Sequence, residues 1–125
     1  MNQFFLKDGD PMECSTEKNP EEIRGKVLAL GNLVDYQEGS IVSREIIRKK
    51  TGTITLFAFD KGQGLSEHTT PFDALVFVLE GKAKVTISGR ALPVNSGEMV
   101  IMPAHEPHAI RAVTSFKMLL VMIRE

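Results

Sequence analysis

The chain of 125 residues contains no tryptophan and a single tyrosine, and its only cysteine is Cys14. One cysteine cannot form an intramolecular disulfide, so the fold does not depend on oxidative cross-links. No apolar run approaches the length of a membrane span, and the first ten residues lack a basic region followed by an apolar core. We therefore expect a cytoplasmic protein with no membrane partner.

An excess of positive charge is also missing. Fifteen basic and sixteen acidic residues give a formal net charge of -1, which argues against nucleic acid as a partner. Hydrophobic residues make up 42% of the chain and charged residues 25%, as in ordinary globular proteins. A chain of this length forms one domain that is large enough to bury a core.

The polar residues 1–25, with breakers at Asp10-Pro11 and Asn19-Pro20, are predicted to form an N-terminal arm. Residues 26–125 contain short apolar runs between Gly-rich turns, and no long segment has helical periodicity. Strands that recur about every 8–12 residues indicate an antiparallel all-β sandwich or barrel. The predicted strands are Ile41 to Arg48, Thr53 to Asp60, Ala74 to Leu79, Lys82 to Ser88, Glu98 to Met102, Ala109 to Val113 and Lys117 to Ile123.

Two Gly-flanked segments place histidines at fixed distances. The first, GQGLSEHTTPFDALVFVLEG, has five residues between Gly62 and His68. The second, GEMVIMPAHEPH, has five residues between Gly97 and Pro103 and ends at His108. This spacing resembles the two motifs of the cupin family, G-x5-H-x-H-x3,4-E-x6-G and G-x5-P-x-G-x2-H-x3-N. The resemblance implies a single-domain jelly roll, or double-stranded β-helix, over residues 26–125.

The same resemblance suggests which residues line the interior of the barrel. A metal-binding cupin uses two histidines and a glutamate from the first motif and one histidine from the second. Here His68 and His108 stand at two of these positions, but Thr70 and Ala74 replace the other histidine and the glutamate. Strand alternation sends Thr70 and Ala74 to the same interior as His68. The resemblance thus implies a divalent transition metal that binds weakly or not at all, because catalytic sites use three protein ligands.

His105 is the one further histidine near this site. It could serve as a third metal ligand, or it could simply satisfy a tight turn in which the family motif has glycine, because histidine tolerates a left-handed backbone. Met102 shares an inward face with Val100 and is expected to line the cavity. The predicted cavity is lined by His68, Thr70, Ala74, Met102 and His108, and it should be open enough for water or a small ligand.

Both faces of the strand at 74–79 are apolar. Ala74, Val76 and Val78 share one face, and Leu75, Phe77 and Leu79 share the other. The outer face must therefore pack against the N-terminal arm or a second subunit. Homodimers are common in the family that the chain resembles, so a homodimer is expected.

Three functions remain open at this level. The first is a small-molecule-binding cupin with a reduced metal site, acting as a sensor or accessory protein. The second is a divergent metal-dependent oxygenase or isomerase that uses His68 and His108, and the third is a metal-free isomerase with a histidine as general base. The fold alone does not choose among them, because one fold hosts many chemistries.

Overall fold

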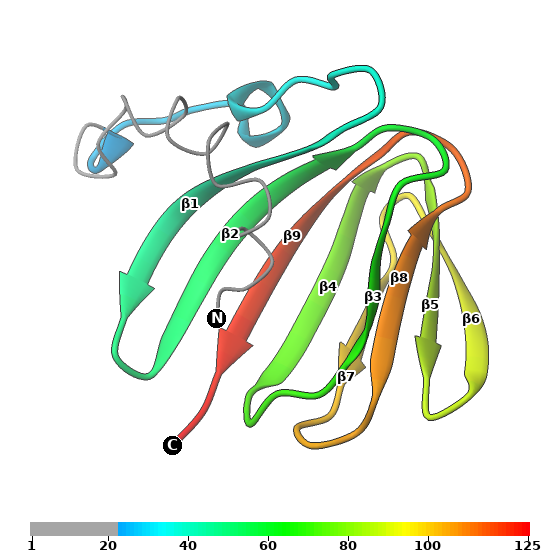
Figure 1. Ribbon diagram of the computed structural model, residues 1–125. Helices are drawn as coiled ribbons and strands as arrows, with labels where there is room; N and C mark the ends of the chain where they lie inside the picture. Colours follow the sequence, from blue (N-terminus) through cyan, green and yellow to red (C-terminus); the bar gives the residue numbers. More distant parts are fainter. Residues whose placement is uncertain (1–22) are drawn as a thin grey trace.

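The computed structural model describes residues 23–125, so most of the arm predicted for residues 1–25 lies outside the described residues. The described part of the chain forms two antiparallel sheets that face each other (Figure 1). The larger sheet has the order β1-β2-β9-β4-β7, and the smaller has the order β3-β8-β5-β6. This arrangement confirms the prediction of an antiparallel all-β jelly roll.

Consecutive strands lie in different sheets, except that β1 and β2 both belong to the larger sheet and β5 and β6 both belong to the smaller one. Their bounds are β1 (Ile41–Lys49), β2 (Gly52–Phe59), β3 (Gly64–His68), β4 (Asp73–Glu80), β5 (Lys82–Ile87), β6 (Arg90–Asn95), β7 (Met99–Met102), β8 (His108–Ala112) and β9 (Phe116–Ile123). The short 3-10 helix η2 (Leu30–Leu33) precedes them. No helix in residues 23–125 is long and apolar enough to cross a membrane.

Strands β3 and β6 were not predicted as strands. β3 reads GLSEH and has one large apolar residue, and β6 reads RALPVN, in which Pro93 interrupts the apolar residues. Both are edge strands of the smaller sheet. An edge position also explains how β6 tolerates Pro93, which cannot donate a ladder hydrogen bond.

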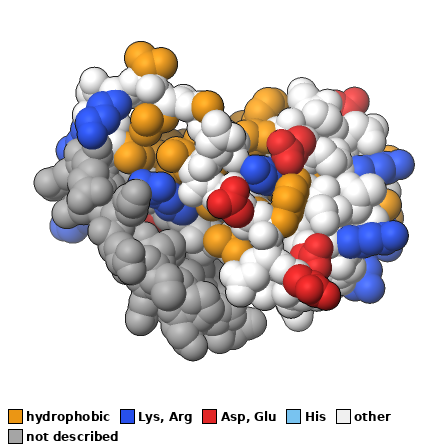
Figure 2. All heavy atoms as spheres, turned by 90° about the horizontal axis from the view of Figure 1, so that it is seen from above, with side chains coloured by type: hydrophobic (Ala, Val, Ile, Leu, Met, Phe, Trp, Pro, Cys, Tyr) orange, Lys and Arg blue, Asp and Glu red, His pale blue; other side chains and the backbone are white. Residues whose placement is uncertain are grey.

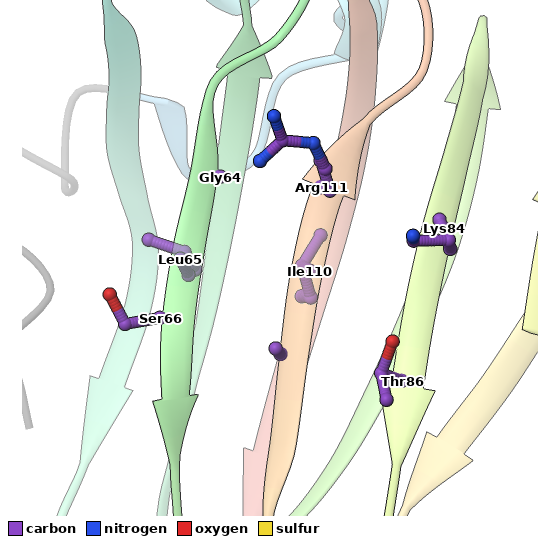
Figure 3. A pocket seen from close by; sticks show the side chains of 8 residues that line it. Gly64, Leu65, Ser66, Lys84, Thr86, Ile110 and Arg111 are labelled. Carbon is purple, nitrogen blue, oxygen red and sulfur yellow. The ribbon is translucent and has the colours of Figure 1, made fainter. Parts of the chain in front are cut away.

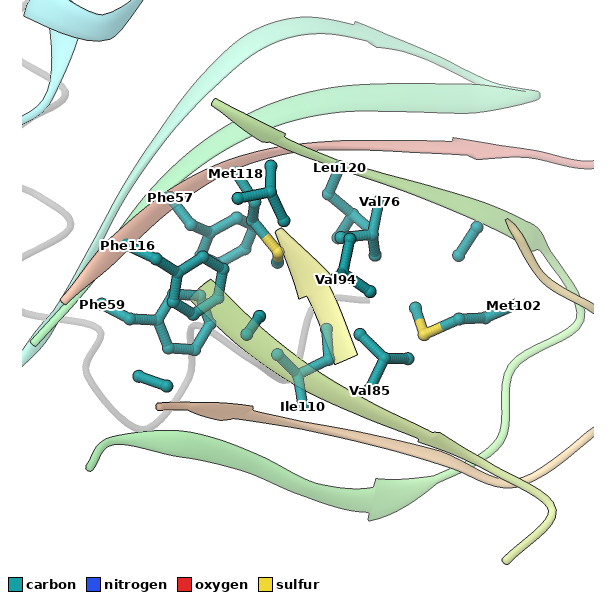
Figure 4. Packing of buried hydrophobic residues seen from close by; sticks show 14 of the residues in the cluster. Phe57, Phe59, Val76, Val85, Val94, Met102, Ile110, Phe116, Met118 and Leu120 are labelled. Carbon is teal, nitrogen blue, oxygen red and sulfur yellow. The ribbon is translucent and has the colours of Figure 1, made fainter. Parts of the chain in front are cut away.

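The hydrophobic core lies between the two sheets (Figure 4). Phe57 and Phe59 on β2 and Phe116 on β9 fill one end of it, and the rings of Phe59 and Phe116 stack with centroids 4.6 Å apart. In β4 the inward residues are fully buried and the outward ones are half-buried, as strand alternation predicts. Burial of this apolar area is the main stabilising contribution.

The outer face of the larger sheet carries a second apolar cluster. Leu56 and Ala58 pack there with Val34, and residues Leu30, Leu33, Val42, Ile46, Leu79 and Leu119 surround them. Residues 23–40 thus cover one part of this face. Figure 2 looks onto the end of the molecule that carries this segment, and hydrophobic side chains gather where the segment lies.

Two polar contacts fasten the segment to the sheet. The buried Lys117 donates from Nζ to the backbone oxygen of Gly31 at 2.7 Å, and its charge lies 5.2 Å from the centre of the Tyr36 ring. Tyr36 in turn donates to Glu80 at 2.6 Å. Burial and the Glu80 carboxylate raise the pKa of the Tyr36 phenol well above its ordinary value. These groups on β4 and β9 fix the path of the chain before β1.

The predicted turn glycines Gly62, Gly81 and Gly97 all have positive φ angles, near +85°. Gly81 has an additional constraint, because a Cβ atom there would collide with the Ser115 oxygen and with Phe116. The turn between β4 and β5 therefore needs glycine both for its conformation and for the close approach of the β8–β9 connection.

Candidate functional site

The residues predicted to line one cavity come from both sheets. On the larger sheet, Ala74 of β4 is the register partner of Met102 on β7 and of Met122 on β9. All three side chains are buried. On the smaller sheet, His68 of β3 is the register partner of His108 on β8. A row of two methionines and an alanine thus belongs to the same internal pocket as a pair of histidines.

The two imidazoles are in direct contact. Their ring centroids lie 4.6 Å apart, with an angle of 71° between the ring planes. His108 is 3% exposed, and His68 is half-buried with its Nε2 atom out of contact with solvent. The register of β3 and β8 shifts between Leu65 and His68. Such irregularities re-aim side chains next to functional sites.

Backbone carbonyls set the orientation of both rings. The Nδ1 atom of His68 lies 2.8 Å from the oxygen of Ser66, and that of His108 lies 3.2 Å from the oxygen of Glu106. Because a carbonyl oxygen can only accept, each Nδ1 carries the hydrogen, and in a neutral ring Nε2 then holds the lone pair. This tautomer is the one in which Nε2 can bind a metal ion or accept a hydrogen bond from a ligand.

Burial favours the neutral form of His108. Desolvation lowers the pKa of His108 below its ordinary value, and the neighbouring His68 lowers it further, while the hydrogen bond to Glu106 opposes both. Two adjacent imidazolium ions would repel each other, so protonation of both rings is unfavourable. At neutral pH the pocket therefore presents a neutral His108.

The pocket is much smaller than the sequence suggested. Its volume is about 10 Å³, which is room for about one water molecule. It is lined by Leu65, His68, Thr70, Ala74, Met102, His108, Ile110, Leu120 and Met122. The five residues named from the sequence do surround one space, but the expectation of an open cavity is wrong for anything larger than water. Apolar side chains fill the space that the absent glutamate and histidine would have taken.

Sequence reasoning missed four lining residues, namely Leu65, Ile110, Leu120 and Met122. The inward direction of Met122 could have been predicted, because it shares a strand face with the inward-facing Met118 and Leu120 in the predicted strand at 117–123. Leu65 had no such signal, since β3 was not predicted as a strand.

Thr70 and Asp73 do not supply the missing ligands. The Thr70 hydroxyl lies 3.2 Å from both the nitrogen and the oxygen of Phe72, so it stabilises the connection between β3 and β4. Asp73 points outward, is exposed, and accepts a hydrogen bond from the Ala104 nitrogen at 2.9 Å. The outward direction follows from alternation along β4, because Asp73 directly precedes the inward-facing Ala74.

His105 lies outside the pocket. Its side chain is exposed, its φ is +69°, and its backbone nitrogen donates to the oxygen of Thr70 at 2.7 Å. Residues 23–125 contain no group of three His, Cys, Asp or Glu side chains that could hold a metal ion. His105 does not line the pocket of His68 and His108, and its left-handed backbone agrees with the alternative interpretation of a turn residue.

A larger hollow of about 310 Å³ lies on the outer face of the smaller sheet (Figure 3). Lys84 and Thr86 on β5, Arg111 on β8 and Ser66 on β3 border it. The hollow is shallow, and its charged side chains are exposed. Leu65 and Ile110 separate it from the histidine pocket, since both residues line the two spaces. The histidine pair belongs to the internal pocket alone.

Comparison with known proteins agrees with this architecture. A sequence model of the cupin domain matches residues 55–124, so the chain belongs to the cupin domain family. The structure of a conserved protein of unknown function from Streptococcus pyogenes is 38% identical, with a TM-score of 0.79 over 82% of this chain and 90% of that one.

Two further structures are similar. A cupin 2 conserved barrel domain protein from Leptotrichia buccalis is 40% identical, with a TM-score of 0.76, and the match covers 78% of this chain but only 47% of that one. A cupin superfamily protein from Desulfitobacterium hafniense is 27% identical, with a TM-score of 0.77 over 82% of this chain and 94% of that one. No curated protein matches the chain.

Proposed function

We propose that this protein is a small-molecule-binding cupin whose ligand contacts His68 and His108 in the internal pocket. The observation that carries the proposal is the orientation of the two rings. Both Nδ1 atoms are held by backbone carbonyls, which fixes the tautomer that leaves Nε2 as the acceptor. Two such rings, 4.6 Å apart between the sheets, form a convergent polar pair in an otherwise apolar pocket.

An organic ligand needs more room than the pocket offers. Met102 and Met122 are the lining side chains best able to yield, because methionine is unbranched and adopts many rotamers. We infer that a ligand enlarges the pocket by moving these thioethers, while the histidine rings keep their hydrogen bonds to the backbone oxygens of Ser66 and Glu106. The favoured ligand is therefore small and partly apolar, with one group that donates a hydrogen bond to imidazole.

The pocket does not fit the divalent metal site of the family. That site uses three histidines and a carboxylate, and Thr70 and Ala74 have replaced two of the four ligands. The alternative function, a divergent metal-dependent oxygenase or isomerase, is favoured only by the surviving histidine pair. It would need the substrate itself to complete the coordination of the metal.

The test is ligand-observed NMR with a defined library of small organic acids, alcohols and amides. A binder of the pocket should lose its signal with His68→Ala and with His108→Ala, and keep it with His105→Ala as the matched surface control. Hits that bind all three variants equally would contradict the proposal. Elemental analysis of untagged protein, followed by addition of Mn²⁺, Ni²⁺ or Zn²⁺, tests the enzyme alternative, which requires stoichiometric metal.

We also propose that a second copy of the chain covers the remaining outer face of the larger sheet. Met99 and Ile101 on β7 and Ile123 on β9 are 47%, 50% and 58% exposed. Leu75 on β4 is half-buried beside Ile101, its register partner. A contiguous apolar area of this kind marks an interaction site.

The dimer can be tested by sedimentation. Ile101→Lys should convert a species of twice the chain mass into a monomer. Val113→Lys, at an exposed hydrophobic residue outside this face, is the control and should leave the mass unchanged. A wild-type protein that stays monomeric at micromolar concentration would contradict the proposal.

A further inference from the structure

The internal pocket is lined by two methionine side chains from the larger sheet and two histidine side chains from the smaller one. Met102 and Met122 flank Ala74 on the larger sheet, and His68 and His108 are paired on the smaller one. All four side chains line the same space of about 10 Å³. Figure 4 shows the Met102 side chain reaching from β7 into the region between the sheets.

The size of this space suits a single ion with direct protein ligands. A volume of about 10 Å³ corresponds to one probe sphere, so an organic molecule enters only if side chains move, whereas a bare ion does not require this. The imidazoles are already oriented by the carbonyls of Ser66 and Glu106. Such contacts to the second ring nitrogen fix metal-binding histidines in place.

The charge of the pocket selects the kind of ion. No residue that lines it carries a carboxylate. The cost of burying an ion rises with the square of its charge, so a divalent ion without an anionic ligand is strongly disfavoured. A monovalent ion pays the smaller desolvation cost. Thioether sulfur is a soft ligand that favours Cu(I), and imidazole also binds copper.

We propose that the pocket binds one soft monovalent metal ion, Cu(I), through Nε2 of His68 and His108 and Sδ of Met102 and Met122. The proposal rests on the proposed function only in taking the same pocket as the binding site. It changes the ligand from an organic molecule to an ion, and the donor set from the family's histidines and glutamate to histidines and methionines.

Silver(I) is the first probe, because it shares the charge and ligand preference of Cu(I) and does not oxidise in air. All variants carry Cys14→Ser, since a thiolate would itself bind these ions. The protein that carries Cys14→Ser alone, called the parent below, should bind one equivalent of Ag(I). Met102→Leu and Met122→Leu should each weaken binding by on the order of tenfold or more, because each removes one ligand and changes volume little.

Met118→Leu is the matched control. Met118 lies on β9 with Met122 and is fully buried in the core, but it does not line the pocket. Its substitution should leave Ag(I) binding unchanged. Thermal unfolding of each variant without metal establishes that the protein is folded. Anaerobic Cu(I) with ascorbate is the second probe, and X-ray absorption of the loaded protein should show sulfur as well as nitrogen ligands.

Several results would overturn the proposal. They are an absence of stoichiometric Ag(I) binding, equal binding by the parent and the Met102 and Met122 variants, equal loss with Met118→Leu, or Zn²⁺ binding as tight as Ag(I) binding. The two proposals can fail separately. Organic ligands that depend on the histidines, without Ag(I) binding, would leave the proposed function standing. Ag(I) binding that depends on the methionines, without organic ligands, would leave this inference standing.

Discussion

The neutral state of buried His108 makes the stability of the fold depend on pH, and this can be measured directly. Burial and His68 lower the pKa of His108 in the folded protein, while in the unfolded chain the ring has its ordinary pKa of about 6.5. Below that pH the unfolded state binds a proton that the folded state resists. The stabilising contribution is therefore fully present above pH 6.5 and is lost as the pH falls toward the folded pKa.

Linkage sets the largest effect that one histidine can have. A difference of one bound proton changes the free energy of unfolding by at most about 1.4 kcal/mol per pH unit. Between pH 6.5 and pH 5 the loss from His108 therefore cannot exceed about 2 kcal/mol. Most carboxylates titrate below this range and contribute little to it.

Urea unfolding at pH 7.5 and pH 5.0 is the assay, with wild type, His108→Gln and His105→Gln compared. Glutamine keeps an amide donor for the Glu106 carbonyl but cannot take up a proton. We expect wild type and His105→Gln to lose similar stability on acidification, and His108→Gln to lose clearly less. An equal loss in His108→Gln and wild type would refute the reasoning, as would a wild-type stability that does not change between the two pH values.

Three further predictions concern the structure around the site, and thermal or urea unfolding measures each. His105→Gly should stabilise the protein by about 0.5–1 kcal/mol, because the left-handed backbone at φ +69° strains any residue with a Cβ; destabilisation would show that the exposed ring has a structural role. Gly81→Ala should destabilise it by more than about 2 kcal/mol, because the added methyl collides with backbone as well as side-chain atoms, whereas Gly89→Ala has open space around it and serves as the control. Lys117→Met should cost about 1–3 kcal/mol by removing the buried ammonium group that donates to the Gly31 oxygen, and it should increase hydrogen exchange in residues 23–40; unchanged exchange would mean that the apolar cluster alone holds this segment.

The strand ladder of this fold can largely be predicted from the sequence, because most strands carry an apolar alternation that burial requires. Strand β4 shows this best, since its buried and half-buried residues alternate as expected. The signal is missing in β3 and β6, the edge strands of the smaller sheet, although the edge strands β1 and β7 of the larger sheet carry it. In β3 and β6 the tertiary pairing with β8 and β5 makes the strand, and no local pattern records it.

The site was predictable in its members but not in its volume. The spacing of the motifs and the alternation of side chains along a strand can both be read from the local sequence. They were therefore enough to predict that His68, Ala74 and His108 line one pocket. Whether the space left by a lost glutamate stays open depends on neighbours from other strands. Here Met102 and Met122 lie on either side of Ala74 and occupy it. Their proximity follows from the order of β7, β4 and β9 in the sheet, which a single sequence does not reveal.

The presence of Ala74 at the position of the family's glutamate thus changes both the volume and the chemistry of the pocket. Replacing a carboxylate by Ala74 removes the anionic ligand that would balance a divalent ion, and the methionines that fill the gap bring soft, neutral donors in its place. The histidines keep their carbonyl partners and hence the tautomer that binds metals or hydrogen-bond donors. An aliphatic side chain in place of the buried His108 would avoid the desolvation cost of the imidazole ring, so packing alone does not call for histidine there. The retained pair, with neutral soft donors across from it, is what favours a binding role over a purely structural one.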